Sequence, residues 1–104
     1  MPTIENCDEL QAGMELDMLI AKEVMGCELE HMTKEFYPST NITAAWKVVE
    51  HLRMRGFFQF QVWNYLYVWH ASFANADFGL TDLEVEAPTA PLAICRAAIR
   101  ARRS

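Results

Sequence analysis

Apolar residues recur at helical spacing in three stretches of the chain. The spacing predicts helices over about residues 7–25, 41–55 and 89–99, because each stretch repeats apolar side chains at intervals of three or four. Gly26 and Gly56 directly follow the first two stretches and are typical helix stop signals. The second helix is expected to bury one apolar side, which consists of Ala44, Ala45, Val48, Val49 and Leu52.

An alternating pattern between the second and third helices predicts a β-hairpin. Strands are expected over residues 57–63 and 67–73, with a turn at 64–66. A brief edge strand is expected near 30–37, and the acidic stretch 74–88 is expected to be a loop. The order α-(β)-α-β-β-α predicts an α+β fold in which helices pack on an antiparallel sheet of about three strands. If elements alternate in direction, the second and third helices begin at opposite ends of the sheet.

The composition describes one globular domain over residues 1–104. Hydrophobic residues make up 52% of the chain, which is typical of a domain that buries a core. The net charge of −5 argues against binding to extended nucleic acid, which depends on clustered cations. Apolar runs fall short of the roughly 20 residues of a membrane-spanning helix, so no membrane partner is expected. Three widely spaced cysteines indicate reduced thiols in a cytosolic protein.

Three segments of the chain resemble recurrent elements of one family. They are IAKEVMG at 20–26, YPSTNITAAWKVVEHL at 37–52 and APTAPLAICRA at 87–97. Together they are similar to the phage ABA-sandwich domain family, whose members are small proteins encoded by bacteriophages and prophages. The resemblance implies a small α/β/α sandwich that is made in the cytoplasm of a host bacterium. It implies no catalytic residue for this chain.

Three helix-capping residues stand in a row before the second helix: Ser39, Thr40 and Asn41. One of them must cap the helix, and capping by itself explains one side chain rather than three. The free N–H groups and hydroxyls at such a helix start can hold an anion or a phosphate. The segment is therefore a candidate phosphate site.

The hairpin combines aromatic rings with amides near its turn. Rings stack on planar bases and amides bond to base edges, so this mixture suits a nucleobase or another flat polar ligand. The candidate residues are Gln61, Trp63, Tyr65 and Tyr67. The simpler interpretation is that hairpin aromatics form the core side of the sheet, and it is favoured for Phe58, Phe60, Trp69 and Phe73.

Cations on the last helix form another candidate site. Arg96, Arg100 and Arg103 are spaced i, i+4, i+7, and they can pair with phosphates or an acidic partner, or simply oppose the helix dipole. Cys27 and His31 are four residues apart but lack the second ligand pair of a structural zinc site. No metal and no cofactor is therefore expected.

These patterns leave three functions open. The first is a non-enzymatic phage accessory protein that binds and sequesters a small nucleotide-like molecule, such as a host antiphage immune signal. The alternative is a protein–protein interaction module that inhibits or adapts a host or phage protein. The third is an enzyme acting on a nucleotide with His70 or His31 as general base, although no paired catalytic group accompanies either histidine. A homo-oligomer is expected, because a dimer would cover a sheet edge or the hairpin.

Overall fold

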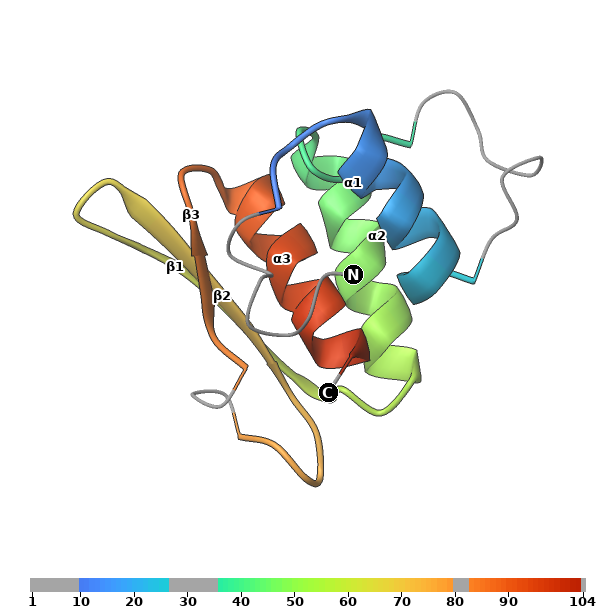
Figure 1. The fold of residues 1–104 in the computed structure, drawn as a ribbon. Helices are drawn as coiled ribbons and strands as arrows, with labels where there is room; N and C mark the ends of the chain where they lie inside the picture. Colours follow the sequence, from blue (N-terminus) through green and yellow to red (C-terminus); the bar gives the residue numbers. More distant parts are fainter. Residues whose placement is uncertain (1–9, 27–35, 80–82, 104) are drawn as a thin grey trace.

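The computed structural model describes residues 10–26, 36–79 and 83–103 (Figure 1). Within them the helices are α1 (Met14–Leu19), its continuation as a π-helix η2 (Ile20–Val24), α2 (Ile42–Met54) and α3 (Ala90–Arg102). The strands are β1 (Gln59–Tyr65), β2 (Val68–Ala74) and β3 (Val85–Ala87). The predicted α+β class, with an antiparallel sheet of three strands, is confirmed for the described part of the chain.

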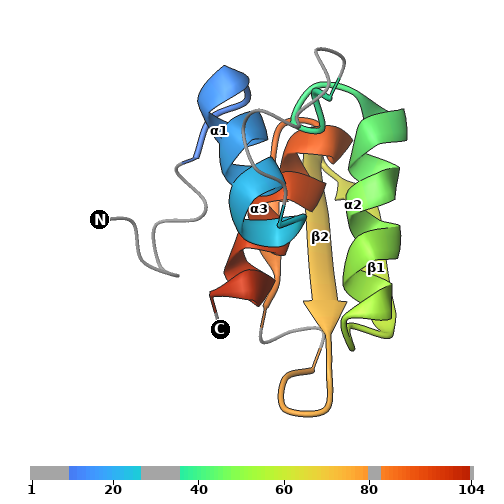
Figure 2. The same cartoon turned by 90° about the vertical axis from the view of Figure 1, so that its right-hand side faces the viewer.

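The helices α1, α2 and α3 lie on one face of the sheet (Figures 1 and 2). α3 occupies the middle of the molecule, where it contacts β2 and β3 on one side and α2 and η2 on the other. Its residues 92–99 are all buried, and the sheet side chains Ala71, Phe73 and Val85 pack in the same core cluster. The fold is thus organised around α3.

The second helix forms as predicted because its signals are local. Asn41 caps its first turn, the predicted apolar side is buried, and Gly56 follows the C-cap with a φ of 103°. That left-handed conformation is one that glycine adopts without steric penalty. Gly26, with a φ of 73°, ends the first helical segment in the same way.

The first helix is shorter than predicted. Its N-cap is Gly13 and its first residue is Met14, whereas residues 10–12 form an irregular approach and residues 7–9 lie outside the described residues. Gly13 has no side chain with which to cap the helix. The Ser39 hydroxyl, from the segment before α2, accepts a hydrogen bond from the Gly13 backbone N–H. The predicted strand near 30–37 falls mostly outside the described residues, and Phe36 and Tyr37 are not in a strand.

The hairpin turn lies one to two residues later than predicted. Tyr65 pairs with Val68, so the two turn residues are Leu66 and Tyr67. The later turn does not change which residues of a strand share a face of the sheet, because side chains alternate between the two faces along each strand. Phe58, however, was expected in the sheet core; it precedes β1 and is 63% exposed.

The stretch expected to be an acidic loop contains β3, which pairs with β2 through Trp69–Ala87, His70–Glu86 and Ala71–Val85. Three strands of alternating direction therefore separate α2 from α3. An odd number of strands makes the two helices run the same way, and both begin at the same end of the molecule (Figures 1 and 2). The expectation that they begin at opposite ends was wrong, because it counted only two strands.

Candidate functional site

The segment before α2 is used mainly to hold the fold together. Ser39 is fully buried, and its N–H donates to Asp17 Oδ1 at 2.8 Å. Its hydroxyl accepts from the Gly13 N–H at 3.0 Å and lies 3.4 Å from the Gly13 carbonyl oxygen, to which it can donate. Ser39 thereby connects the start of α1 to the start of α2.

The other two capping residues also have internal partners. The Asn41 side-chain oxygen accepts from the Ala44 N–H at 3.1 Å, which makes Asn41 the N-cap. The Thr40 hydroxyl donates to the Tyr37 carbonyl oxygen at 3.5 Å and is exposed. Capping of α2 therefore explains one side chain of the three, as expected, because Ser39 and Thr40 bond to other parts of the backbone.

The arginines of α3 differ in environment. Arg96 is only 6% exposed; its Nε donates to the Leu10 carbonyl oxygen at 2.7 Å and its Nη1 to the Glu86 carbonyl oxygen at 2.8 Å. Arg103 pairs with Glu23 at 2.8 Å, and Arg100 is half-buried. Arg96 was expected to offer its charge to a ligand; instead it joins the N-terminal segment and β3 to α3.

Three of the four predicted hairpin residues share one face of the sheet, whereas Tyr67 lies in the turn. The sheet face opposite α3 carries every second residue of β1, among them Gln61, Trp63 and Tyr65. The same face of β2 carries His70, which pairs with Trp63. The Trp63 and His70 rings are stacked, with centroids 5.0 Å apart and an 8° angle between the planes. His70 Nδ1 lies 3.2 Å from Glu84 Oε1 and 3.9 Å from Glu86 Oε1.

This surface, which we call the outer face, is aromatic and acidic. The two carboxylates beside His70 come from the stretch that sequence reasoning assigned to a loop. Their position beside His70 depends on the pairing of β3 with β2 and so was not visible in the sequence. A cation is the group that both an indole ring and the carboxylates beside its stacking partner His70 attract.

The tip of the hairpin carries the most unusual backbone of the described chain. Leu66 has a φ of 49° and Tyr67 a φ of 68°; they are the non-glycine residues with positive φ among those described. Both side chains are exposed, Leu66 at 69% and Tyr67 at 94%, and the adjacent Tyr65 at 65%. Tight hairpin turns normally place asparagine, aspartate or glycine at these positions, because bulky residues are strained there.

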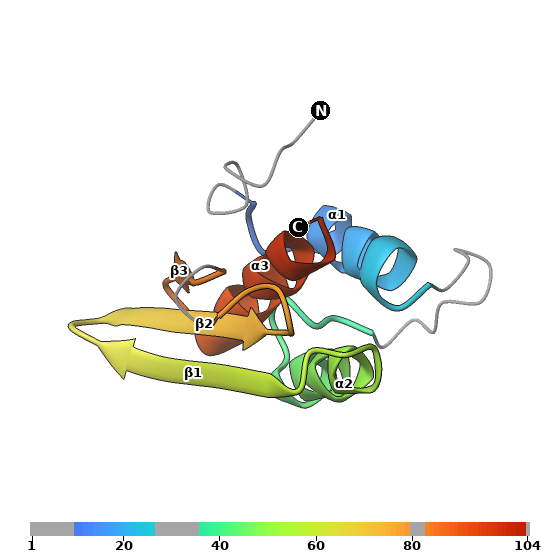
Figure 3. The same ribbon diagram turned by 90° about the horizontal axis from the view of Figure 1, so that it is seen from below.

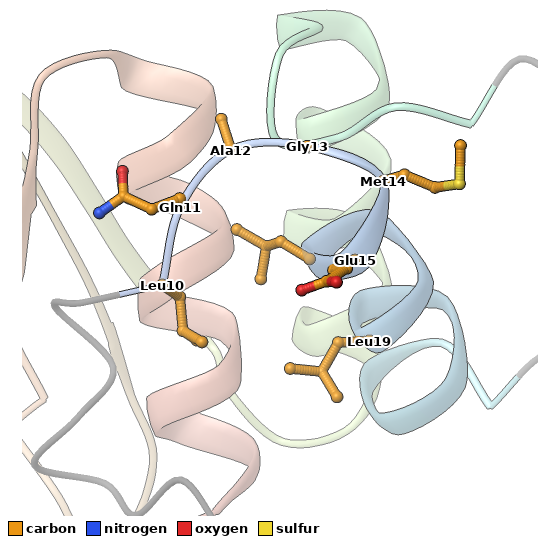
Figure 4. A pocket seen from close by; sticks show the side chains of 8 residues that line it. Leu10, Gln11, Ala12, Gly13, Met14, Glu15 and Leu19 are labelled. Carbon is orange, nitrogen blue, oxygen red and sulfur yellow. The ribbon is translucent and has the colours of Figure 1, made fainter.

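A hollow of about 610 Å³ lies between the N-terminal approach and α1 (Figure 4). The side chains of Leu10 and Leu19 point into it from two sides, and Glu15 also lines it. The remaining lining residues are mostly small or apolar, so the hollow offers few polar groups that would orient a ligand.

Metal and thiol chemistry find little support in the residues that the structure describes. Among them, no group of three or more His, Cys, Asp or Glu side chains could hold a metal ion. The predicted pair Cys27 and His31 lies outside the described residues. Burial, reinforced by the Asp17 carboxylate, raises the pKa of the Cys95 thiol far above its ordinary range, which keeps that thiol protonated and unreactive.

None of the helices in the described ranges is long and apolar enough to cross a bilayer.

An antiparallel sheet with its helices packed around α3 defines the protein as a small α+β sandwich. The chain belongs to the phage ABA sandwich domain family, whose model matches residues 18–99. This match confirms the resemblance carried by the three sequence segments. No curated protein and no solved structure matches the chain.

Proposed function

We propose that the protein is a non-enzymatic interaction module that inhibits or adapts a host or phage protein through the tip of its hairpin. The observation that carries this proposal is the pair Leu66 and Tyr67, which are left-handed, bulky and exposed. Backbone strain at an exposed site lowers the stability of the free protein. Contact of the Leu66 and Tyr67 side chains with a partner protein accounts for bulky residues at these two turn positions.

The outer face extends the proposed contact surface from the tip along the strands. Tyr65 lies between Leu66 and the stacked Trp63 and His70, and the carboxylates of Glu84 and Glu86 stand beside His70. Aromatic residues are typical of the centres of protein interfaces, and charged residues are typical of their rims. The acidic charge favours a partner that presents arginine or lysine next to an apolar patch.

A hollow of about 320 Å³ lies beside the tip of the hairpin. Its lining runs from Tyr67 and Val68 at the end of the hairpin to Glu86, Ala87 and Pro88 at the end of β3. Arg96 also contributes to the lining, and its Nε and Nη1 donate to the backbone carbonyls of Leu10 and Glu86. A single side chain of a partner would fit in a hollow of this size.

The partner is tested by crosslinking from a defined position. A photo-reactive benzophenone side chain replaces Tyr67, and in a matched protein it replaces Lys22, which is exposed on η2. Both proteins are produced in phage-infected bacteria and irradiated. We expect a discrete heavier product from position 67 that is absent from position 22. Equal products from both positions, or none from position 67, would contradict the proposal.

A second candidate is capture of a small flat molecule on the outer face. Gln61, Trp63 and Tyr65 lie side by side there, as the sequence predicted, and a base could stack on the indole. Two observations weigh against a phosphate-bearing ligand: Glu84 and Glu86 stand next to His70, whose ring is stacked on the indole, and Ser39 and Arg96 bond within the protein. The nucleotide-like immune signal is therefore ranked below a protein partner.

This second candidate is separated from the first by a thermal-shift screen against cyclic di- and trinucleotides, ADP-ribose derivatives and common nucleotides. A ligand that binds only the folded protein raises its melting temperature by mass action. A specific rise that Trp63→Ala abolishes would favour capture of a small molecule, and so an anti-defence role by sequestration. A flat response would favour the protein partner. Either activity is proposed to take place in the bacterial cytoplasm.

A further inference from the structure

The sheet is covered by helices on one face only in the part of the chain that the structure describes. The helices α1, α2 and α3 lie on one side of it, and no described helix crosses the outer face (Figures 1 and 3). Gln61 and Tyr65 are exposed on the outer face, and Trp63 between them is half-buried. A sheet face that presents aromatic rings to solvent is typical of a surface that meets a partner.

Charge divides the molecule into two sides. The sequence contains no lysine and no arginine between Arg55 and Arg96, a stretch that includes all three strands. The lysines and arginines that the structure describes therefore lie in the helices or at their C-caps. The sheet side carries the carboxylates of Glu84 and Glu86 instead. Its potential attracts cations, whereas the helical side presents both signs of charge.

The two carboxylates keep an excess of negative charge. Both approach the same nitrogen, since Glu84 Oε1 lies 3.2 Å and Glu86 Oε1 lies 3.9 Å from His70 Nδ1. An imidazole carries at most one positive charge. Within the described ranges, no lysine or arginine side chain forms an ion pair with either glutamate. The two glutamate side chains are 34% and 64% exposed, so a cation of a partner can reach them.

We infer that the outer face binds a segment of the partner protein that carries arginines. The inference rests on the proposed function and names the chemistry of the partner. A guanidinium is planar, so it stacks on aromatic rings and donates two parallel hydrogen bonds to a carboxylate, whereas the ammonium of lysine is a point charge. The outer face offers both groups, with rings on Trp63 and Tyr65 and carboxylates on Glu84 and Glu86.

The strand order sets the spacing of the arginines. The rings belong to β1, and the carboxylates stand in β3 or directly before it, with β2 in between. Two strand spacings of about 4.8 Å each separate β1 from β3, and an extended segment advances about 3.3 Å per residue. A segment that crosses the strands therefore places arginines two or three residues apart on the rings and on the carboxylates.

Two peptides of equal charge test this chemistry on the full chain. The probes are fluorescently labelled hexa-arginine amide and hexa-lysine amide, and fluorescence anisotropy measures their dissociation constants. We expect hexa-arginine to bind at least about threefold more tightly, because hexa-lysine gains mainly the charge attraction. Indole N–H signals in NMR spectra locate the contact. The Trp63 signal should shift when hexa-arginine is added, and the signal of Trp46, which lies on α2, should not.

Matched removals of charge test the surface. Glu84→Gln/Glu86→Gln should weaken hexa-arginine binding about five- to tenfold, because two ion pairs are lost. Glu15→Gln/Glu50→Gln makes the same change in net charge at exposed helical positions and should weaken binding less than about twofold, because salt screens distant charges. Circular dichroism confirms that each variant is folded.

Three results would each overturn the inference: equal affinity for the two peptides, an equal loss of affinity in the two double variants, or a Trp63 signal that does not move. None of them alters the outcome of crosslinking from position 67, which tests the proposed function separately. A discrete crosslink together with equal affinity for the two peptides would therefore leave the proposed function standing and remove the arginine chemistry alone.

Discussion

Replacing the hairpin tip by ordinary turn residues should stabilise the protein. Leu66 and Tyr67 occupy left-handed backbone conformations, and each costs roughly 1–2 kcal/mol for a residue with a Cβ atom. The double variant Leu66→Asn/Tyr67→Gly places there the residues that tight hairpin turns prefer. Little packing is lost, because the two side chains are 69% and 94% exposed.

The size of the gain follows from three contributions. Glycine removes the strain at position 67, and asparagine removes part of it at position 66, together roughly 2–3 kcal/mol. Glycine also adds roughly 0.5–1 kcal/mol of conformational entropy to the unfolded chain. The net stabilisation is about 1.5 kcal/mol, which corresponds to a rise in Tm of roughly 6–12 °C for a domain of this length.

Urea unfolding monitored by tryptophan fluorescence measures this gain. The midpoint should rise while the slope of the free energy against urea stays unchanged, because the surface exposed on unfolding is nearly the same. Tyr67→Ala is the matched control: it removes the ring but keeps a left-handed Cβ residue, and should change stability by less than about 0.5 kcal/mol. A lower midpoint for the double variant would refute the reasoning, since it would mean that the tip side chains stabilise the free fold.

Two substitutions and one labelling experiment test the internal roles assigned above. Arg96→Met should lower the free energy of unfolding by about 3 kcal/mol, because it removes two charge-assisted hydrogen bonds; Arg53→Met, on the exposed side of α2, should change it by less than about 0.5 kcal/mol in the same denaturation assay. Ser39→Ala should lower it by about 1–2 kcal/mol, since the half-buried Gly13 N–H loses its acceptor; an unchanged urea midpoint would contradict this. Cys95 should resist iodoacetamide at pH 8 in the native protein and react after unfolding, as followed by mass spectrometry, because burial raises the pKa of its thiol; rapid native labelling would show that it is accessible.

Local signals made part of the fold predictable. The cap, the apolar period and the stop glycine of α2 lie within sixteen residues of sequence, from Asn41 to Gly56, and all three favour the same helix. The turn at Leu66 and Tyr67 was displaced in the prediction because neither residue is typical of a turn. β3 was missed because a three-residue strand in an acidic stretch has too short a pattern to recognise.

The candidate site was predictable only where strand alternation decides the geometry. Gln61, Trp63 and Tyr65 share a face because they alternate along one strand. The buried roles of Ser39 and Arg96 depend on contacts with Gly13, 26 residues away, and Leu10, 86 residues away. Capping preference and charge periodicity carry no information about contacts of that range, so both side chains looked available to a ligand.

The central claim is that the strained hairpin tip binds a protein. Calorimetry would compare the affinity of the partner crosslinked from position 67 for the wild-type chain and for Leu66→Asn/Tyr67→Gly. The account predicts that the variant binds at least about tenfold more weakly, as expected when interface anchors are removed, although it is the more stable protein. Equal affinity of the two proteins for the partner would contradict the claim.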